Sequence, residues 1–341
     1  MRAVVYSRTG DTEVLRLVNR PVPAAGLGEV LVRVAVSGVN PTDWKARRGA
    51  RAHEPLAFSE MVPHHDGAGT IVAVGAGVEP ARDGQRVWLW EAAWGRCDGT
   101  AQEFVALPQA NAVPLPDTAT FDLGACLGVP ALTAHRCLTV GADTAGSLAP
   151  RSLHGCNVLV AGGAGAVGHA AIELACWAGA TVVATVSSSA KAVLAKSAGA
   201  HYVFNYRESD PTEAIRAVCS GGVDVIVEVN PVLNSKLDQA VLAPNGTIAS
   251  YASAPDTLQL DVRLAESQNA RHQFVMIFSI PQGPKERAVH DVSAAVRASV
   301  LRVGADAGLP VHRFSLEKVA QAHAAVEGGA VGKVLIDVSQ S

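Results

Sequence analysis

The stretch N-V-L-V-A-G-G-A-G-A-V-G, residues 157–168, decides the fold class of this chain. A short apolar strand runs into the pattern Gly163-x-Gly165-x-x-Gly168, and an alanine-rich stretch of helical length follows at 166–179. In such a strand–turn–helix unit the first glycine permits a tight turn, the second lets a pyrophosphate approach the backbone, and the third lets helix and strand pack closely. The helix start then offers its free N–H groups to the phosphates. The stretch therefore predicts a dinucleotide-binding loop; the alternative is a glycine-rich turn without a ligand.

Beyond this loop, apolar strands alternate with stretches of helical character. Further strands are expected at 181–186, 201–205, 223–229 and 247–251. Alternation at this spacing predicts right-handed crossovers and a doubly wound parallel sheet with helices on both faces, which is an α/β fold.

The remainder of the chain has a different pattern. Before residue 122 the sequence reads as short strands between turns, which is typical of an irregular barrel, and a final strand is expected at 333–338. The 341 residues also exceed what one compact core usually holds. We therefore expect a dinucleotide-binding domain at 123–264, inserted into a barrel-like substrate domain built from 1–122 and 265–341.

Composition favours a small-molecule enzyme over a protein that binds polymers or membranes. The formal net charge is −3, 49% of the residues are hydrophobic, and no basic stripe is present, so we expect no nucleic-acid partner. No apolar stretch reaches the roughly 20 residues of a membrane span. The N-terminal residues do not resemble a secretory signal, and the cysteines are scattered. We expect a cytoplasmic protein with reduced thiols and no membrane partner.

The segment V-S-S-S-A-K, residues 186–191, bears on the choice of cofactor. NAD-binding proteins place Asp or Glu at the end of the second strand, about 20 residues past the loop, to hold the ribose 2′-hydroxyl. Here no acid is in reach, and the Ser187 and Ser188 hydroxyls with the Lys191 ammonium could instead hold a 2′-phosphate. Tyr206 could add a hydroxyl on the same side. We expect NADPH, although one of these serines could also cap the next helix.

Four stretches carry a resemblance to a known family: G-V-N-P-T-D-W-K (38–45), A-G-G-A-G-A-V-G (161–168), A-G-A-H-Y-V-F-N-Y (198–206) and G-K-V-L-I-D-V (332–338). Nearly the whole chain resembles the zinc-independent medium-chain dehydrogenases/reductases, above all the quinone oxidoreductases of the zeta-crystallin type. The resemblance implies a Rossmann domain with a GroES-like irregular β-barrel, and reduction of quinones or activated alkenes.

The resemblance also implies where the site residues lie. In that family the cofactor lies in the cleft between the two domains. Tyr251, Ile277 and Phe278 would face the nicotinamide half, and Asn40 and Thr133 would lie beside nicotinamide and substrate. Asn40 could bind a substrate oxygen or a ribose hydroxyl, or merely support the turn before the next proline. The residues that match the family's cofactor wall are Ala164, Gly165, Ala166, Val167, Ser187, Lys191, Tyr206 and Asn234.

Two features near the expected substrate site have open readings. Zeta-crystallin-like members carry a tyrosine where this chain has Lys45, and the D-W-K version resembles the enone and enoyl reductase branches. Lys45 is then a cofactor or substrate contact, or a solvated charge at the start of a helix. The run V-W-L-W-E-A-A-W ends at Trp94, which we expect beside the substrate, whereas Trp88 and Trp90 have the spacing of core residues. The segment 141–156 also looks longer than usual in the family.

A catalytic zinc is not expected. Such a site needs three protein ligands and an open position. Asn40 matches the family's first ligand, normally a cysteine, and a neutral amide is a poor substitute. Cys97 stands alone where zinc-containing relatives cluster four cysteines. His64, His65 and Asp66 are adjacent but lack a distant third partner in the sequence, which favours a hydrogen-bonded corner over a metal site.

These observations predict an NADPH-dependent oxidoreductase that transfers hydride to quinones or activated alkenes without a metal. Such acceptors delocalise the developing charge, so the site needs position, dryness and a hydrogen-bond donor, for which Asn40, Lys45 and Thr133 are candidates. The proton could come from solvent. Alternatives are an enone or enoyl-thioester reductase of a biosynthetic pathway, a zinc alcohol dehydrogenase, or a non-catalytic NADPH-binding protein. The run 273–280 is expected to form a strand that pairs across a two-fold axis, giving a homodimer.

Overall fold

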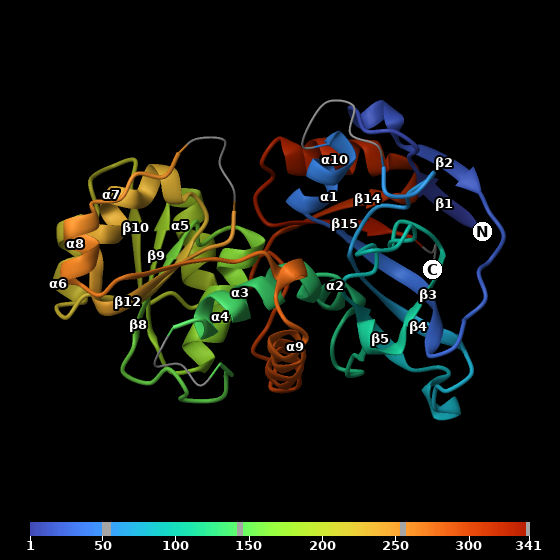
Figure 1. Cartoon of the computed structure of the whole chain (residues 1–341), viewed down its shortest axis with the longest axis horizontal. Helices are drawn as coiled ribbons and strands as arrows, with labels where there is room; N and C mark the ends of the chain where they lie inside the picture. The colour runs from blue at the N-terminus through green and yellow to red at the C-terminus, as the bar shows by residue number, and fades with distance from the viewer. Residues whose placement is uncertain (50–55, 142–145, 253–256, 339–341) are drawn as a thin grey trace. The chain divides into compact units, whose positions relative to one another are not determined.

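The computed structural model describes residues 1–49, 56–141, 146–252 and 257–338 (Figure 1). The chain divides into two compact units, one formed by Met1–Val129 with Pro310–Ser341 and the other by Pro130–Leu309. Among the described helices, none combines the length and the hydropathy that a membrane span requires.

The first unit is built around a seven-stranded sheet that mixes residues from both ends of the chain. Along the central strand β3, Val30, Val32 and Val34 are fully buried and alternate with Arg33, which faces solvent, as expected for a strand with one covered face. The sheet strands, in spatial order, are β14 (Val311–Ser315), β15 (Lys333–Asp337), β3 (Glu29–Val39), β4 (Asp66–Val74), β5 (Arg86–Leu89) and β7 (Ala112–Pro114), with β6 (Phe104–Pro108) on β3. The other elements are β1 (Arg2–Val5), β2 (Arg16–Asn19), α1 (Pro41–Arg48), α2 (Phe121–Gly124) and α10 (Val319–Glu327).

The strand β15 brings the end of the chain to the start of the site. It pairs antiparallel with β3, with Val334 opposite Val39. Asn40 follows β3 directly and precedes α1, so this register places it beside Lys333, the first residue of β15. The expected strand at 333–338 is therefore confirmed, and its pairing joins two residues far apart in the sequence.

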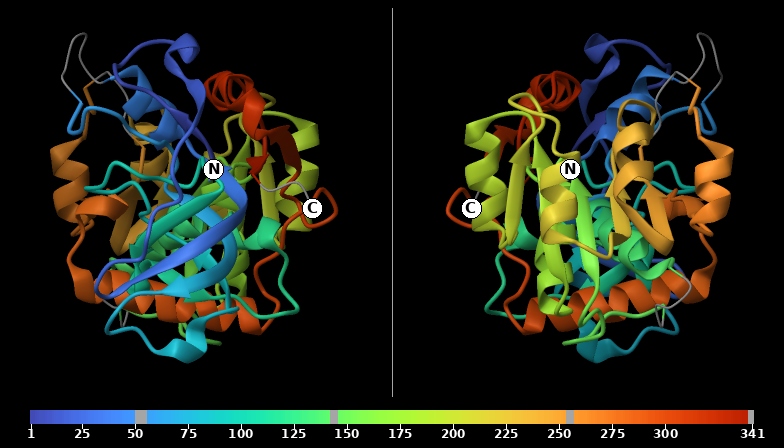
Figure 2. Two further views of the ribbon diagram at one scale, coloured as in Figure 1. Left: turned by 90° about the vertical axis from the view of Figure 1, so that its right-hand side faces the viewer. Right: turned by 90° about the vertical axis from the view of Figure 1, so that its left-hand side faces the viewer.

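The second unit is a doubly wound parallel sheet in the order β10-β9-β8-β11-β12-β13 (Figure 2). This arrangement confirms the predicted α/β class. The order reverses between β8 and β11, and ligands of such sheets bind at that point, beyond the carboxyl ends of the strands. The strands are β8 (Asn157–Ala161), β9 (Thr181–Val186), β10 (Tyr202–Asn205), β11 (Val223–Glu228), β12 (Leu242–Ser250) and β13 (Arg271–Phe274). The helices are α3 (Leu132–Thr139), α4 (Ala166–Trp177), α5 (Ser189–Ser197), α6 (Thr212–Val218), α7 (Pro231–Val241), α8 (Val262–Ser267) and α9 (Gln282–Arg297).

The limits of the two units differ from the expected limits at 122/123 and 264/265. Residues 265–309 belong to the second unit because β13 extends its sheet beside β12 and α9 packs on α3. The first boundary lies later, at 129/130, because α2 packs on β4 and β5.

The expected strand at 273–280 is also only partly correct. Strand β13 ends at Phe274, and a 3-10 turn, η5 (Ile277–Ser279), follows it. Val275, Ile277 and Phe278 are buried, so their apolar run reflects packing into the unit rather than a longer edge strand.

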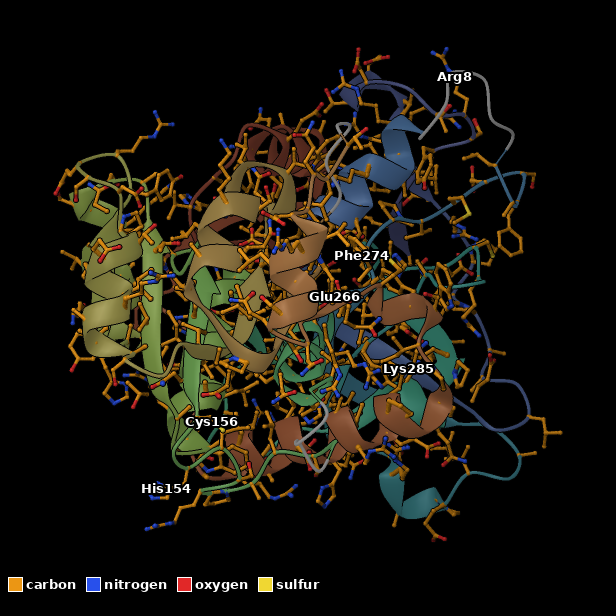
Figure 3. The ribbon with its side chains drawn as sticks, turned by 60° about the vertical axis from the view of Figure 1, so that its left-hand side comes forward. Arg8, His154, Cys156, Glu266, Phe274 and Lys285 are labelled. Carbon is orange, nitrogen blue, oxygen red and sulfur yellow. The ribbon has the colours of Figure 1, made fainter. Side chains whose placement is uncertain are left out.

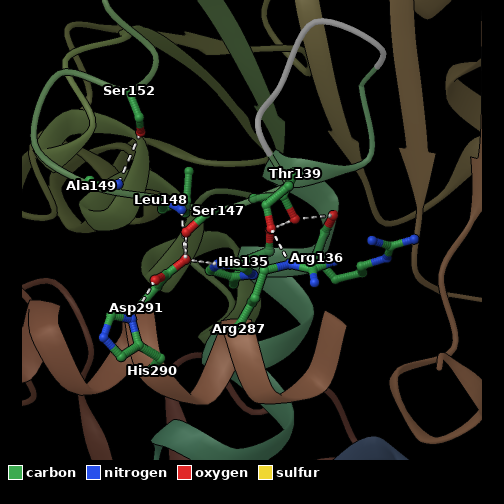
Figure 4. Close-up of polar contacts among 11 residues, drawn as sticks. His135, Arg136, Thr139, Ser147, Leu148, Ala149, Ser152, Arg287, His290 and Asp291 are labelled. Atoms are coloured by element: carbon green, nitrogen blue, oxygen red, sulfur yellow. Dashed lines mark hydrogen bonds and ion pairs between the residues drawn. The ribbon is translucent and has the colours of Figure 1, made fainter. Parts of the chain in front are cut away.

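One carboxylate of the second unit binds several groups of the long segment at 141–156, of which residues 142–145 lie outside the described part. Asp291 of α9 accepts hydrogen bonds at Oδ2 from Ser147 Oγ (2.7 Å), Leu148 N (2.7 Å) and His135 Nε2 (2.8 Å) (Figure 4). Burial alone would raise the pKa of Asp291, but the hydrogen bonds from His135, His290, Leu148 and Ser147 hold it well below its usual range. The structure thus gives the described part of this segment a role in packing.

Candidate functional site

The glycines of the loop between β8 and α4 separate into two kinds. A Cβ on Gly168 would lie 2.4 Å from the carbonyl oxygen of Gly162, and one on Gly163 would lie 2.9 Å from Cβ of Ala184, so both positions need glycine for close packing. A Cβ on Gly165 would meet nothing nearer than 3.5 Å. The left-handed turn itself falls on Gly162, with φ of 71°. Gly165 is thus the exposed position where a ligand can approach the backbone.

This loop fits a pyrophosphate. Gly165 is the N-cap of α4 and brings no capping side chain, so N–H groups of the first turn have no side-chain partner there. The positive end of the helix dipole favours an anion at that point. The Ala164 side chain is buried, so this residue can offer a ligand its backbone alone, while Ala166 and Val167 form the first turn.

The end of β9 carries a hydroxyl and an ammonium in contact. Lys191 Nζ donates to Ser187 Oγ at 2.9 Å. Ser188 caps α5, because its side chain accepts from the Lys191 backbone N–H at 3.3 Å. Tyr206 follows β10, and its N–H binds the Val186 carbonyl at 3.1 Å while its ring stays exposed. Ser187 and Lys191 therefore form a small cationic, hydrogen-bonding pair beside Tyr206.

A buried acidic pair, which the sequence reasoning missed, consists of Glu228 at the carboxyl end of β11 and Asp238 on α7. Glu228 Oε1 accepts from Asn234 Nδ2 at 2.9 Å and from the backbone N–H of Asn230. Burial raises the pKa of Glu228, and burial together with the neighbouring Glu228 raises the pKa of Asp238 well above its usual range. Each of the two carboxyl groups therefore keeps its proton to a higher pH than an isolated carboxyl group does. Glu228 holds Asn234 in place, and its carbonyl accepts from the N–H of Tyr251 at 3.0 Å.

Three expected nicotinamide-side residues lie inside the second unit. Thr133 on α3 and Ile277 and Phe278 in η5 are all buried, and α3 packs against η5. Lys285 of α9, labelled in Figure 3, donates from Nζ to the Phe278 carbonyl at 2.8 Å. That Ile277, Phe278, Thr133 and Tyr251 face the nicotinamide stays a prediction.

In the first unit, three polar side chains with almost no exposure form a connected network. Asn40 Nδ2 donates to Asp66 Oδ2 at 2.7 Å, and Lys333 Nζ donates to Asn40 Oδ1 at 2.6 Å. Lys333 Nζ lies 3.6 Å from Asp66 Oδ2. Asn40 and Lys333 are each 2% exposed and Asp66 is 0% exposed. The Asn40 side chain therefore binds a charge pair, and the support of the turn comes from its backbone N–H, which donates to Asp43 Oδ2 at 2.6 Å.

Two further contacts hold this network. The second oxygen of Asp66 accepts from the Val129 N–H at 2.9 Å. Gly128 permits this approach, because a Cβ there would lie 2.1 Å from Asp66 Oδ1. Burial, with a further contribution from the nearby Asp66, raises the pKa of Asp43 to about 8.

The histidines beside the network belong to a hydrogen-bond chain of fixed direction. Thr100 Oγ1 donates to the Asp66 carbonyl (2.5 Å), so Ser37 Oγ donates to Thr100, His64 Nδ1 donates to Ser37, and His323 Nε2 donates to His64 Nε2. Burial lowers the pKa of His64 well below its usual range and that of His323 to about 3. Both rings are neutral.

Burial lowers the pKa of the neighbouring His65 to about 4. Within the described residues, no three His, Cys, Asp or Glu side chains converge as a metal-binding group.

The remaining expected residues are spread over the first unit. Trp88 and Trp90 are buried, which confirms their reading as core residues, and Trp94 is half exposed. Lys45 is exposed on α1, with Nζ 5.8 Å from the centre of the Trp44 ring. Substrate contact by Lys45 and Trp94 remains a prediction.

Comparison with known proteins supports the division into a barrel-like unit and a dinucleotide-binding unit. Residues 26–117 match the alcohol dehydrogenase GroES-like domain, and residues 166–289 match the zinc-binding dehydrogenase domain. The quinone oxidoreductase of Rattus norvegicus is 30% identical over 344 residues, which cover 98% of this chain and 97% of the relative. The human quinone oxidoreductase is 30% identical over 340 residues with the same coverage.

Solved structures of oxidoreductases also match nearly the whole chain. A mycobacterial quinone oxidoreductase is 28% identical with a TM-score of 0.81, covering 98% of this chain and 99% of the other. A mycobacterial protein solved in complex with NADPH is 27% identical with a TM-score of 0.80 and the same coverage. An NAD-dependent alcohol dehydrogenase is 28% identical with a TM-score of 0.83, covering 99% of this chain and 100% of the other.

Proposed function

The chain belongs to the quinone oxidoreductase branch of the medium-chain dehydrogenases/reductases, and from this premise we propose that it uses NADPH to reduce quinones or activated alkenes without a catalytic metal. The observation that carries the proposal is the Ser187–Lys191 pair at the end of β9, beyond a glycine loop whose Gly165 is open to a ligand. The complex of a mycobacterial relative with NADPH supports the same cofactor.

The second unit would hold the cofactor. The N–H groups at the start of α4 would bind the pyrophosphate, and Lys191, Ser187 and the Tyr206 hydroxyl would bind the 2′-phosphate through charge-assisted hydrogen bonds. Glu228 would orient Asn234 toward the ribose half. When bound, NADPH supplies the hydride.

The first unit would supply the hydrogen-bond donor for the substrate oxygen. Asn40 Nδ2 has a second hydrogen besides the one given to Asp66, and a donor held in place stabilises charge that develops on a carbonyl or quinone oxygen. Lys45 and Thr133 are additional donors in the proposal, and the Trp94 face would pack on a flat acceptor. The proton then comes from solvent.

The network fits a zinc ion poorly, and this selects the substrate class. Asn40 offers a neutral amide whose oxygen already accepts from Lys333, and the ammonium occupies the space beside Asp66. Hydrogen-bond donors polarise a carbonyl less than a metal does. Quinones and α,β-unsaturated carbonyls, which delocalise the incoming charge, are thus better acceptors here than simple ketones.

We also propose a homodimer formed at the edge of the second unit's sheet. Phe274 on the edge strand β13 is 62% exposed, and Met276 beyond it is 57% exposed. An apolar sheet edge left open invites pairing with a second copy. Light scattering that gives the mass of one chain would contradict this proposal.

One screen separates the candidate functions. Purified protein is mixed with NADPH and with 9,10-phenanthrenequinone, a 2-alkenone or an enoyl thioester, and NADPH absorbance is followed. Rapid oxidation with the quinone and the alkenone is expected. Turnover with the thioester alone would indicate the biosynthetic reductase that Lys45 suggests, and binding without oxidation would indicate a non-catalytic NADPH-binding protein. About one tightly held zinc per chain, with oxidation of an alcohol, would indicate an alcohol dehydrogenase.

A further inference from the structure

The neighbours of Asn40 determine how its side-chain amide is oriented. An ammonium can only donate hydrogen bonds and an ionised carboxylate can only accept them, whereas an amide has one accepting and one donating end. Oδ1 therefore faces Lys333 Nζ at 2.6 Å and Nδ2 faces Asp66 Oδ2 at 2.7 Å. The reversed amide would bring donor against donor and acceptor against acceptor, which leaves buried groups unsatisfied.

Fixing the orientation of the Asn40 amide with two buried charges costs free energy. Lys333 and Asp66 have side-chain exposures of 1% and 0%, and removing such ions from water costs several kcal/mol each, often more than their attraction returns. Apolar residues of similar size would often be as stable. What the pair adds at this place is a single orientation of the amide between them.

The orientation has a consequence for the outer hydrogen of the amide. Nδ2 carries two hydrogens, and within the described residues it donates to Asp66 Oδ2 alone. With Nδ2 fixed against Asp66, and Asp66 fixed by the Val129 N–H, the second hydrogen has one direction.

We propose that Lys333 is a positioning residue for the reaction: through its bond to Oδ1 it holds the Asn40 amide so that the second Nδ2–H is presented to the substrate oxygen. This inference rests on the proposed function of Asn40. Lys333 is buried away from solvent. The proposal gives this side chain a role in the reaction that is separate from its effect on stability.

A charge-compensated variant distinguishes positioning from stability. Lys333→Met alone leaves Asp66 buried without its cation, so a large loss of stability is expected from it. Lys333→Met combined with Asp66→Asn removes both charges and should recover most of the lost unfolding temperature, yet it leaves the amide free to reverse. Lys318→Met, at an exposed lysine of the same unit, is the matched control.

The kinetic result expected for the compensated variant is a fall in kcat of about 100-fold with the quinone, the lower end of the loss caused by removing one positioned donor. The Kd for NADPH should be unchanged. Adding Asn40→Ala should cause little further loss, since both changes remove the same interaction. A compensated variant with wild-type kcat, or one in which Asn40→Ala costs as much as it does in the wild type, would overturn the proposal.

A measurement without substrate keeps this inference separate from the proposed function. In protein labelled with 15N-asparagine, the Asn40 side-chain amide is assigned by its loss in Asn40→Ala, and its proton bonded to Asp66 should lie downfield of an unbonded amide proton. In the compensated variant this signal should move toward the position of an unbonded amide proton, or broaden. Unchanged amide signals would overturn the positioning role. If the wild type reduces none of the acceptors, the proposed function fails, and these signals alone decide whether Lys333 orients the amide.

Discussion

Replacing Asp43 by Asn should change how the stability of the protein depends on pH. Burial raises the pKa of Asp43 from an ordinary value of 3.8 to about 8. The unfolded chain then loses its proton near pH 4 while the folded chain keeps it, so stability falls as pH rises between these values. The largest slope is about 1.4 kcal/mol per pH unit, which amounts to roughly 4 kcal/mol between pH 5 and pH 8.

The Asn variant removes this titration. It keeps an oxygen that can accept from the Asn40 N–H, and any hydrogen bond that it loses costs the same at every pH. Urea denaturation of both proteins at pH 5, 6, 7 and 8 gives the difference in unfolding free energy. We expect the variant to gain on the wild type by up to about 4 kcal/mol across this range. Asp83→Asn, at an exposed aspartate of the same unit, should show no such trend. A constant difference between Asp43→Asn and wild type at all four pH values would refute the reasoning.

Two other predictions concern the second unit. Gly168→Ala should destabilise the fold, because its Cβ would lie 2.4 Å from a backbone oxygen, whereas Gly165→Ala should keep wild-type stability and weaken NADPH binding. Thermal unfolding measures the stability of each variant and fluorescence titration measures its affinity for NADPH. Equal effects of the two substitutions would contradict the assigned roles. Asp291→Asn should lower stability by about 1–3 kcal/mol at neutral pH, since charge-assisted hydrogen bonds are lost. Because the folded pKa of Asp291 is depressed, its contribution is present above about pH 4 and is lost as pH falls further, so variant and wild type should converge in acid denaturation; a gap that stays constant there would argue against it.

The sequence predicted what depends on local pattern. The strand, loop and helix at 157–179 follow from the spacing of glycines and apolar residues, and the Ser187–Lys191 contact joins residues one helical turn apart. The contacts that the sequence did not predict depend on pairing between strands that are far apart in the chain. Lys333 stood in a recognised motif, but its contact with Asn40 exists because β15 pairs with β3.

Long-range strand pairing also explains why the expected domain limits were wrong. Residues 265–309 were assigned to the wrong unit because β13 joins the sheet through pairing with β12, a partner more than 20 residues away in sequence. Glu228 and Asp238 look like ordinary polar residues of a strand end and a helix. The raised pKa values of both groups follow from burial, which a single sequence does not reveal.

The central claim is that Lys191 and Ser187 select NADPH, and reversing the charge of Lys191 tests it most directly. Lys191→Glu is compared with Lys196→Glu, an exposed lysine on the same helix, by measuring kcat/KM for NADPH and for NADH with the same quinone. The account predicts that Lys191→Glu lowers the NADPH/NADH ratio by about 10- to 100-fold, the worth of a charge-assisted hydrogen bond to phosphate, while Lys196→Glu leaves it near that of the wild type. An unchanged ratio in Lys191→Glu would contradict the account.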